Sequence, residues 1–423
     1  MTTTAPGFAE AAVRERARSG TAALFPRLDD YGSALYGATA PAGDDLDRLR
    51  IAPPNFTDLR LEKLIDLGRE PLYSDVELAT EIGGFRSSLP VYLSAVGSTR
   101  AADTELIRQA SRQAGAAGIP MVIGENVIGM SGYGRLDGLT GRSIVDRITA
   151  YRGELPDCLG GVTVQQNTED ADAELWNLVY SDPTALPLLE SGRLAFELKI
   201  GQGAKPGLGG MTLVDRQTAD RVGDVYHIEQ LGSADQLLRS STPGTFTAEI
   251  LRQQIRLMRN NFPRALVWVK LIPGRDVAAA AEVAWAAGAD AVTVDGAEGG
   301  TGWAPLAFLE HVGLPLADCL RLVDSRQRCL LASGRMWEGS RALKALALGA
   351  RAVGLGRAAL LSVDENPETG LRNLLACLAT ELRLLISAVG KYGPSQLSVE
   401  DLWTNQPTEG VPAPPATVGS SHG

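Results

Sequence analysis

Eight short apolar segments, separated by helical stretches, constrain this chain more than any other feature. Most of them are continuous apolar runs, which is typical of parallel strands buried on both faces. The stretches between them, most clearly 276–290 and 338–350, have the spacing of amphipathic helices. Eight strand–helix repeats in order predict an α/β fold, a (β/α)8 TIM barrel, with a doubly wound parallel sheet as the alternative. The eight segments begin at Leu89, Ile119, Gly160, Leu194, Ala265, Asp290, Cys329 and Arg351.

The segments that flank the repeats divide the chain further. Residues 1–85 mix short helical patterns with Pro and Gly breaks, and we expect an N-terminal extension that packs on the barrel. Residues 86–392 hold the barrel and a strong amphipathic helix after its last strand. Residues 393–423 read as a C-terminal tail that ends in a disordered, Pro-containing stretch. The weakly periodic segment 203–247 follows the fourth strand, so we expect it over the catalytic face.

Composition excludes several classes of function. A net charge of −10 without any Lys/Arg run argues against nucleic acid or an anionic membrane surface as partner. No apolar stretch reaches the ~20 residues of a membrane span, and the N-terminus has no apolar signal core. Four scattered cysteines fit a cytoplasmic protein and offer no zinc or iron–sulfur framework. With three histidines in the chain, we expect no metal site, and chemistry that relies on Lys, Arg, carboxylates or a bound cofactor.

Two Gly- and Arg-containing loops follow the seventh and eighth predicted strands. Gly334 and Arg335 lie in the first, and Gly356 and Arg357 lie in the second. Glycines let a phosphate group approach backbone N–H groups, and phosphate sites after these two strands recur in TIM barrels. The two loops therefore predict a phosphate site, and two tight turns with surface arginines are the alternative.

Other polar residues follow the fourth to sixth predicted strands. Lys270 lies within an apolar strand, where a lysine is costly unless it meets a negative charge, such as that of a reduced flavin ring; the alternative is a side chain that reaches solvent. Lys199, Gln202 and Lys205 form a cationic and amide cluster suited to a carboxylate, or else a salt-bridged strand end. Glu298, in a glycine-rich loop, is a candidate general acid or base, or a solvated loop carboxylate.

Five of these segments resemble the FMN-binding barrel of glutamate synthases, in one order over about 90–390. They are ELKIGQGAKPGLGG, VWVKLIPG, VDGAEGGTGWAPL, ASGRMWEGSRALKALALGA and VGLGRAALL. The GQGAKPG and GGTG motifs are specific signals, far more so than a lone pair of glycines. The resemblance implies a TIM barrel with FMN as cofactor, whose reduced form delivers hydride to an imino acid made from a 2-oxo acid and ammonia.

The resemblance also implies roles for single residues. Lys270 stands where the family has a lysine near the flavin N1 and C2 carbonyl, and this lysine, Lys199 and Glu298 are the candidate catalytic residues. Substrate contacts are implied for Lys199, Gln202, Lys205, Met211 and Trp303. Flavin contacts are implied for Ser94, Ala95, Val96, Ser98, Gln202, Lys270, Gly299, Gly300, Thr301, Gly334, Arg335, Gly356 and Arg357.

The chain departs from the family in five places. One is the segment from Ser241 to Phe246, which stands where the family usually has a His-containing stretch. Met211 replaces a polar residue that helps hold 2-oxoglutarate, and Trp303 replaces a small residue. The cysteine-rich iron–sulfur segment after the eighth strand and the N-terminal glutaminase have no counterpart here. We therefore expect a stand-alone FMN oxidoreductase that acts on CH–NH2 substrates, an amino, imino or 2-oxo acid with a carboxylate, in specialised amino-acid metabolism.

Two other functions stay open at this stage. The chain is alternatively the FMN-bearing subunit of a multi-chain glutamate-synthase-like complex, or it runs hydroxy-acid oxidation or a non-redox isomerisation on the same barrel. Hydroxy-acid oxidation usually needs a His base near an Arg, and no histidine lies at a predicted strand end. The expected partners are a carboxylate substrate, an electron donor (reduced nicotinamide or a partner flavoprotein) and further copies of this chain.

Overall fold

The computed structural model describes most of the chain between residues 3 and 403. The described ranges are 3–24, 43–96, 104–124, 138–167, 173–201, 203, 211–214, 216–223, 226–230, 237–240, 246–299, 304–325 and 328–403.

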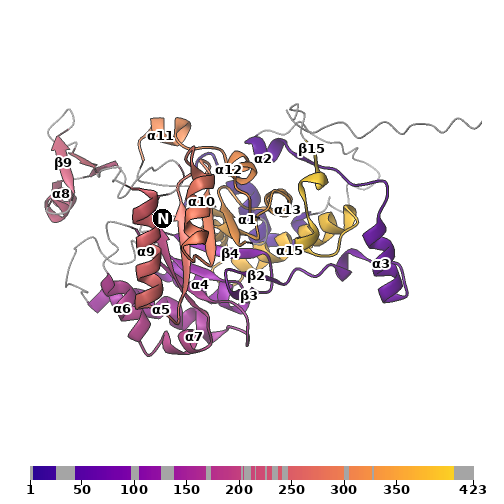
Figure 1. The fold of residues 1–423 in the computed structure, drawn as a ribbon, viewed down its shortest axis with the longest axis horizontal. Coiled ribbons are helices and arrows are strands. Elements are labelled where there is room, and N and C mark those ends of the chain that lie inside the picture. Colours follow the sequence, from indigo (N-terminus) through magenta and orange to yellow (C-terminus); the bar gives the residue numbers. More distant parts are fainter. Residues whose placement is uncertain are drawn as a thin grey trace, which may run out of the picture.

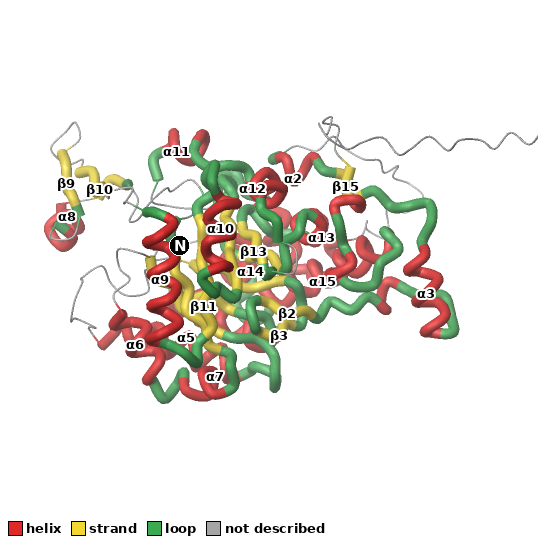
Figure 2. The backbone as a smooth tube through the Cα atoms, viewed as in Figure 1, coloured by secondary structure: helices red, strands yellow, loops and turns green. Residues whose placement is uncertain are grey.

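Eight parallel strands close into a barrel at the centre of the molecule (Figure 2). They follow one another around the barrel in chain order, and the last pairs with the first through Val353 and Val91. The predicted TIM barrel is thus confirmed, and closure excludes the doubly wound sheet. The strands are β4 (Val91–Val96), β5 (Met121–Ile123), β6 (Val162–Asn167), β7 (Leu194–Lys199), β11 (Leu266–Leu271), β12 (Ala291–Asp295), β13 (Leu330–Ser333) and β14 (Ala352–Leu355).

Helices surround the barrel and bury their apolar faces against the strands. The long helix α15 (Gly370–Ala388) follows the last barrel helix, as its sequence pattern predicts, and buries Leu371, Leu374, Leu378 and Leu382. The barrel helices are α4 (Thr104–Ala116), α5 (Gly138–Gly153), α6 (Ala173–Ser181), α7 (Leu186–Glu190), α9 (Ala248–Asn261), α10 (Val277–Ala286), α12 (Leu316–Leu322), α13 (Gly339–Ala347) and α14 (Arg357–Glu365). The short helix α11 (Leu306–His311), between β12 and α12, buries none of its residues.

A hairpin closes the end of the barrel where the strands begin. Its strands are β2 (Thr80–Ile82) and β3 (Phe85–Ser87), which pair antiparallel. Ile82 and Phe85 are buried in an interior cluster with Trp268, whose indole N–H donates to the carbonyl of Gly83 at 3.0 Å. The apolar plug leaves the opposite end of the barrel, where the strands finish, as the place for polar chemistry.

The N-terminal segment lies against the last helices of the barrel. Helix α1 (Glu10–Ser19) contacts α14 and α15, where Arg14 pairs with Asp364 at 3.0 Å and Arg16 with Glu381 at 2.6 Å. After it come the 3-10 helix η1 (Gly20–Leu24), the short helix α2 (Asp45–Arg48), strand β1 (Arg50–Ile51) and helix α3 (Asp58–Leu67). Strand β1 pairs with β15 (Leu402–Trp403), so residues near the C-terminal end of the described chain also pack on this segment.

The long segment after β7 forms a small unit of its own. Strands β8 (Thr212–Val214), β10 (Leu237–Ser240) and β9 (His227–Gln230) pair antiparallel in that order, next to α8 (Arg216–Val222). This unit, which we expected over the catalytic face, stands apart from the barrel strands in Figure 1. Among the described residues, no helix combines the length and the apolar character that crossing a bilayer requires.

Candidate functional site

Two lysines lie side by side where the barrel strands end. Lys199 on β7 and Lys270 on β11 are register partners, and each is 4% exposed. The ammonium group of Lys270 pairs with the carboxylate of Asp295 on β12 at 3.2 Å. The side chain of Lys270 is buried and paired, so it does not reach solvent. This excludes the alternative given above, a lysine whose ammonium group lies in water.

Asp295 joins this pair to the next strand. Its carboxylate also accepts a hydrogen bond from the hydroxyl of Ser333 on β13. Buried charges are tolerated when they are paired and hydrogen-bonded, and here each oxygen of Asp295 has a partner. The result is a fixed ammonium–carboxylate–hydroxyl row across β11, β12 and β13.

A buried glutamate lies one layer deeper in the barrel. Glu197 is 1% exposed and accepts hydrogen bonds from the amide of Gln165 and from the hydroxyl of Thr293, the latter at 3.0 Å. Burial raises the pKa of Glu197, and the nearby charge of Lys270 opposes this shift. Sequence reasoning did not include Gln165 or Thr293, although a polar residue inside an apolar strand was the available signal.

The two Gly/Arg loops lie next to each other at the ends of β13 and β14. Gly334 has φ +136° and Arg335 has φ +55°, a conformation that is uncommon for a residue other than glycine. Arg335 donates through Nη1 to Asp47 at 2.6 Å and to Asp44 at 3.3 Å. Its Nε is buried and has no hydrogen-bond partner in the described part of the chain.

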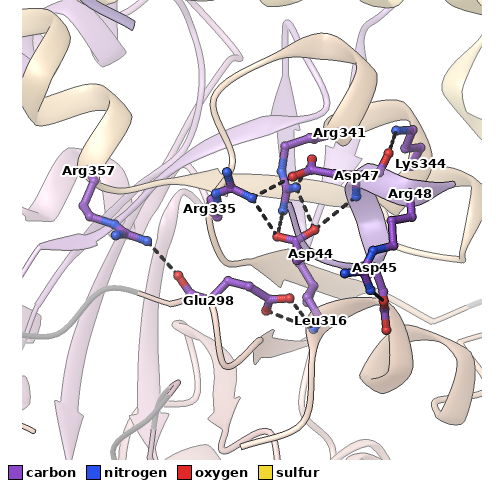
Figure 3. Close-up of polar contacts among 10 residues, drawn as sticks. All are labelled: Asp44, Asp45, Asp47, Arg48, Glu298, Leu316, Arg335, Arg341, Lys344 and Arg357. Carbon is purple, nitrogen blue, oxygen red and sulfur yellow. Dashed lines mark hydrogen bonds and ion pairs between the residues drawn. The ribbon is translucent and has the colours of Figure 1, made fainter. Parts of the chain in front are cut away.

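Arg357 is the second arginine of these loops. It donates to the main-chain carbonyl of Glu298 at 2.7 Å, and its guanidinium lies 4.6 Å from the ring centre of Phe8 (Figure 3 shows the first contact). Burial lowers the pKa of Arg357, Asp295 opposes the shift, and the charge of Arg335 adds to it. Both arginines therefore have positions fixed by the fold, rather than being solvated surface side chains.

Glu298 directs its carboxylate toward helix α12. Both carboxylate oxygens accept from the backbone N–H of Leu316, at 3.0 and 3.3 Å (Figure 3). Burial raises the pKa of Glu298 to about 7, with a further increase from Asp44. The carboxylate caps a helix in this structure, and a role in proton transfer stays a prediction.

The remaining sequence-predicted residues fall into two groups. Ser94 is buried, Ala95 and Val96 are half-buried at the end of β4, and Gly299 closes a turn by donating to the carbonyl of Gly296 at 2.8 Å. Met211 is half-buried just before β8, and Gly356 precedes α14. Six predicted site residues lie outside the described residues: Ser98, Gln202, Lys205, Gly300, Thr301 and Trp303.

Two aspartates from the N-terminal segment contact the first of the two Gly/Arg loops, which are called the arginine loops below. Asp44 and Asp47 contact Arg335 and also Arg341, which is fully buried in α13. These contacts join residues almost 300 positions apart, so no local pattern in the sequence indicated them. In the part of the chain that the structure describes, no group of three or more His, Cys, Asp or Glu side chains is arranged to hold a metal ion.

Comparison with known sequences connects this site to a family. Residues 189–366 match the family described as a conserved region in glutamate synthase. The chain is 36% identical over 184 residues to an archaeal-type glutamate synthase (NADPH) of Dehalococcoides mccartyi, a match that covers 41% of this chain and 36% of that protein. It is 35% identical over 184 residues to a glutamate synthase large subunit-like protein of Rhizobium meliloti, covering 41% and 40%. The resemblance drawn from the motifs is confirmed, and the chain spans less than half the length of these relatives.

Comparison with solved structures bears on the fold alone. A soluble mutant of the membrane-associated (S)-mandelate dehydrogenase from Pseudomonas putida aligns with a TM-score of 0.51 at 19% identity, over 94% of this chain and 99% of that one. A mandelate oxidase mutant solved with an FMN adduct aligns with a TM-score of 0.50 at 20% identity, over 84% and 88%. Both agree with the closed barrel described above.

Proposed function

Since residues 189–366 carry the conserved region of glutamate synthases, we propose that this chain is an FMN-dependent oxidoreductase of glutamate synthase type. The proposed substrate is an amino, imino or 2-oxo acid that carries a carboxylate. The observation that carries the proposal is the placement of two anchored arginines and a buried, paired lysine at the same end of one barrel.

The arginine loops fit the phosphate of FMN. Arg335 has a buried Nε with no partner among the described residues, and Gly334 adopts a φ of +136° that brings its backbone close to the loop after β12. A phosphate monoester supplies acceptor oxygens for such a donor, and its charge offsets the repulsion between the two guanidinium groups. The residues that would hold it are Gly334, Arg335, Gly356 and Arg357.

Lys270 would stabilise negative charge on the flavin ring. Bound FMN would supply two-electron redox chemistry to the site. Lys270 offers a positive charge whose position is fixed by Asp295 at 3.2 Å. A charge that is already in place needs no reorganisation when negative charge develops next to it, which makes this kind of stabilisation effective. Ser94, Ala95, Val96, Ser98, Gln202, Gly299, Gly300 and Thr301 remain the proposed neighbours of the ring.

Lys199 would orient the substrate carboxylate. It is buried beside Lys270 on the neighbouring strand, and the deeper Glu197 limits the excess of positive charge between them. Lys205 and Gln202 are proposed to assist, and Met211 and Trp303 to shape a pocket different from that for 2-oxoglutarate. This altered pocket is our reason for proposing specialised amino-acid metabolism.

Histidine placement favours this substrate class over hydroxy acids. His227 is exposed on β9, and His311 is exposed at the end of α11, where it lies 3.7 Å from Glu310. Neither of these two histidines lies on a barrel strand, where a base for hydroxy-acid oxidation would be expected.

The source of electrons separates two forms of the proposal. An enzyme that works alone takes electrons from reduced nicotinamide, whereas a subunit of a larger synthase takes them from a partner flavoprotein. The matched region spans less than half of the length of these relatives. For this reason the subunit form stays the second candidate.

The test is an anaerobic titration of the FMN-loaded chain with reduced nicotinamides, followed by 2-oxo acids with ammonia or an amine. We expect reduction to bleach the flavin absorption and the oxo-acid mixture to restore it, with the amino acid as product. Turnover by the isolated chain contradicts the subunit form. A chain that takes up no FMN contradicts the proposed function itself.

A further inference from the structure

The short N-terminal helix α2 is joined to the arginine loop after β13 by a network of ion pairs. Asp47 pairs with both Arg335 and Arg341, and Asp44 pairs bidentately with Arg341 through two contacts of 2.9 Å (Figure 3). Lys344 adds a bond from its ammonium to the carbonyl of Asp47 at 3.2 Å. This helix of only four residues is therefore attached to the barrel by charged groups on one side and by Leu46, which is fully buried in the core.

The cluster sets the carboxylates of Asp44 and Asp47 against the charges of Arg335, Arg341 and Lys344, and the Nε atoms of both arginines have no partner in the described chain. Arg341 is fully buried, and both oxygens of Asp44 are occupied by it. Arg335 shares the same two carboxylates through Nη1 alone, and its Nε, buried and without a partner in the described chain, is left for another acceptor. The left-handed backbone of Arg335 is strained, and such strain persists when surrounding contacts hold the residue in place.

From this arrangement we infer that Asp44 and Asp47 are positioning residues of the phosphate site: they hold Arg335 so that its Nε faces a bound phosphate monoester, and phosphate binding and the docking of α2 stabilise each other. The inference rests on the proposed function, because FMN is the phosphate monoester concerned. Coupling of this kind is reciprocal, so the ligand protects the helix by as much as the helix strengthens the binding of the ligand.

A second contact of the N-terminal segment, with Arg357, also supports the inference. Phe8 lies under the guanidinium of Arg357, so each arginine of the two loops contacts the segment before the barrel. Figure 3 places Arg335 between Arg357 and the Asp44–Asp47 pair. The outer wall of the anion site is thus built from residues that precede the first barrel strand.

The test compares D47N with the matched control D45N in the full chain. Asp45 is on the same helix, but it pairs at 2.7 Å with the exposed Arg48 and not with the loop arginines. Apoprotein is titrated with FMN and with riboflavin, which carries the same ring without the phosphate. We expect D47N to bind FMN about tenfold more weakly, as for the loss of one charged hydrogen bond, while riboflavin binding and the D45N variant stay unchanged.

Hydrogen exchange measures the docking of α2 in the wild-type chain, so the result does not depend on how a substitution affects folding. FMN is expected to slow exchange in a peptide that covers 44–49 more than riboflavin does, with α7, at the other side of the barrel, as internal reference. Equal protection by both ligands overturns the inference.

The remaining outcomes are also decisive. FMN binding by D47N that equals that of the wild type, or that falls in parallel with riboflavin binding, overturns the positioning role. Tighter FMN binding means that the carboxylates compete with the phosphate for Arg335, and this overturns it as well. Failure of the wild type to bind either flavin overturns the proposed function itself.

Discussion

Lys270 and Asp295 form the contact that matters most at the scale of single residues. The chain contains a second Lys–Asp pair, Lys391 with Asp401 at 2.7 Å, near the C-terminal end of the described chain. The two pairs have the same chemistry, but Lys391 is half-buried where Lys270 is buried, and only the first pair lies on barrel strands. Comparing them separates the cost of breaking a buried ion pair from the effect on a bound flavin.

The prediction concerns the midpoint potential of the bound flavin. K270Q removes a positive charge expected beside the ring, so the reduced anionic form loses stability. We expect the potential to fall by about 30 mV or more, which for two electrons is a tenfold change in equilibrium. K391Q is expected to lower stability and leave the potential unchanged. Equal potentials in wild type and K270Q would contradict the role of Lys270.

Glu298 provides a pH-dependent signal. Its pKa is raised to about 7 in the folded chain, mainly by burial, against an ordinary value of 4.5. Between these two values the folded state binds more protons than the unfolded state, so the free energy of unfolding falls as pH rises from about 4.5 to 7. Gln at this position keeps an acceptor for the Leu316 N–H and has no charge to titrate.

We therefore expect E298Q to become more stable relative to wild type as pH increases, by on the order of 1–3 kcal/mol between pH 5 and 8. Chemical denaturation at several pH values measures this difference. E310Q alters an exposed glutamate and should follow the wild-type curve. A parallel pH dependence for E298Q and wild type would show that Glu298 titrates as an ordinary carboxylate.

Single residues also mark how far sequence reasoning reaches in the site. The placement of Lys270, Arg335 and Arg357 at the ends of barrel strands was predictable, because each directly belongs to or follows an apolar strand segment, whereas their roles at the site stay predictions. The ion pair of Lys270 with Asp295 was not predicted as a contact, and neither was the use of the Glu298 carboxylate as a helix cap. Both depend on the register between strands and loops, which apolar periodicity alone does not specify.

At the scale of elements, the β2–β3 hairpin determines how the barrel is closed. Gly83 has φ +54°, and a Cβ atom there would lie 2.5 Å from the indole of Trp268. Its carbonyl accepts the indole N–H, so the backbone at Gly83 lies against the ring. Gly68 at the end of α3 has a similar φ of +65°, with nothing within 4 Å of an added Cβ.

This contrast gives a prediction for G83A and G68A. Both variants place alanine in a left-handed conformation at a cost of about 1 kcal/mol, but only G83A also forces the plug away from Trp268. We expect G83A to lose about 2–4 kcal/mol of unfolding free energy and G68A about 1 kcal/mol. Chemical denaturation distinguishes them, and equal losses would mean that the hairpin adjusts without cost.

The eight barrel strands were predictable from the sequence, whereas the two-residue strands β1 and β15 were not. The mainly apolar runs of strands such as β7 and β11 alternate regularly with helical stretches, which indicates parallel strands buried on both faces. The pairing of β1 with β15 involves two residues on each strand, and it joins segments about 350 positions apart. Nothing in so short a stretch distinguishes a strand from a loop.

At the scale of the whole molecule, the barrel is enclosed by both ends of the described chain. Helix α1 packs on α14 and α15, α2 packs on the loop after β13, and β15 pairs beside them. The cofactor site proposed at the ends of the strands is thus supported by segments outside the repeats. The small unit of β8, β9, β10 and α8 is the part that stands away from this body (Figure 1).

Whether this barrel carries FMN is decided by the visible spectrum of the purified chain. We expect flavin absorption without a broad iron–sulfur contribution, and one FMN per chain when the released cofactor is identified by mass. A colourless chain that takes up no FMN on reconstitution would mean that the arginine loops hold another anion, and it would contradict the oxidoreductase proposal.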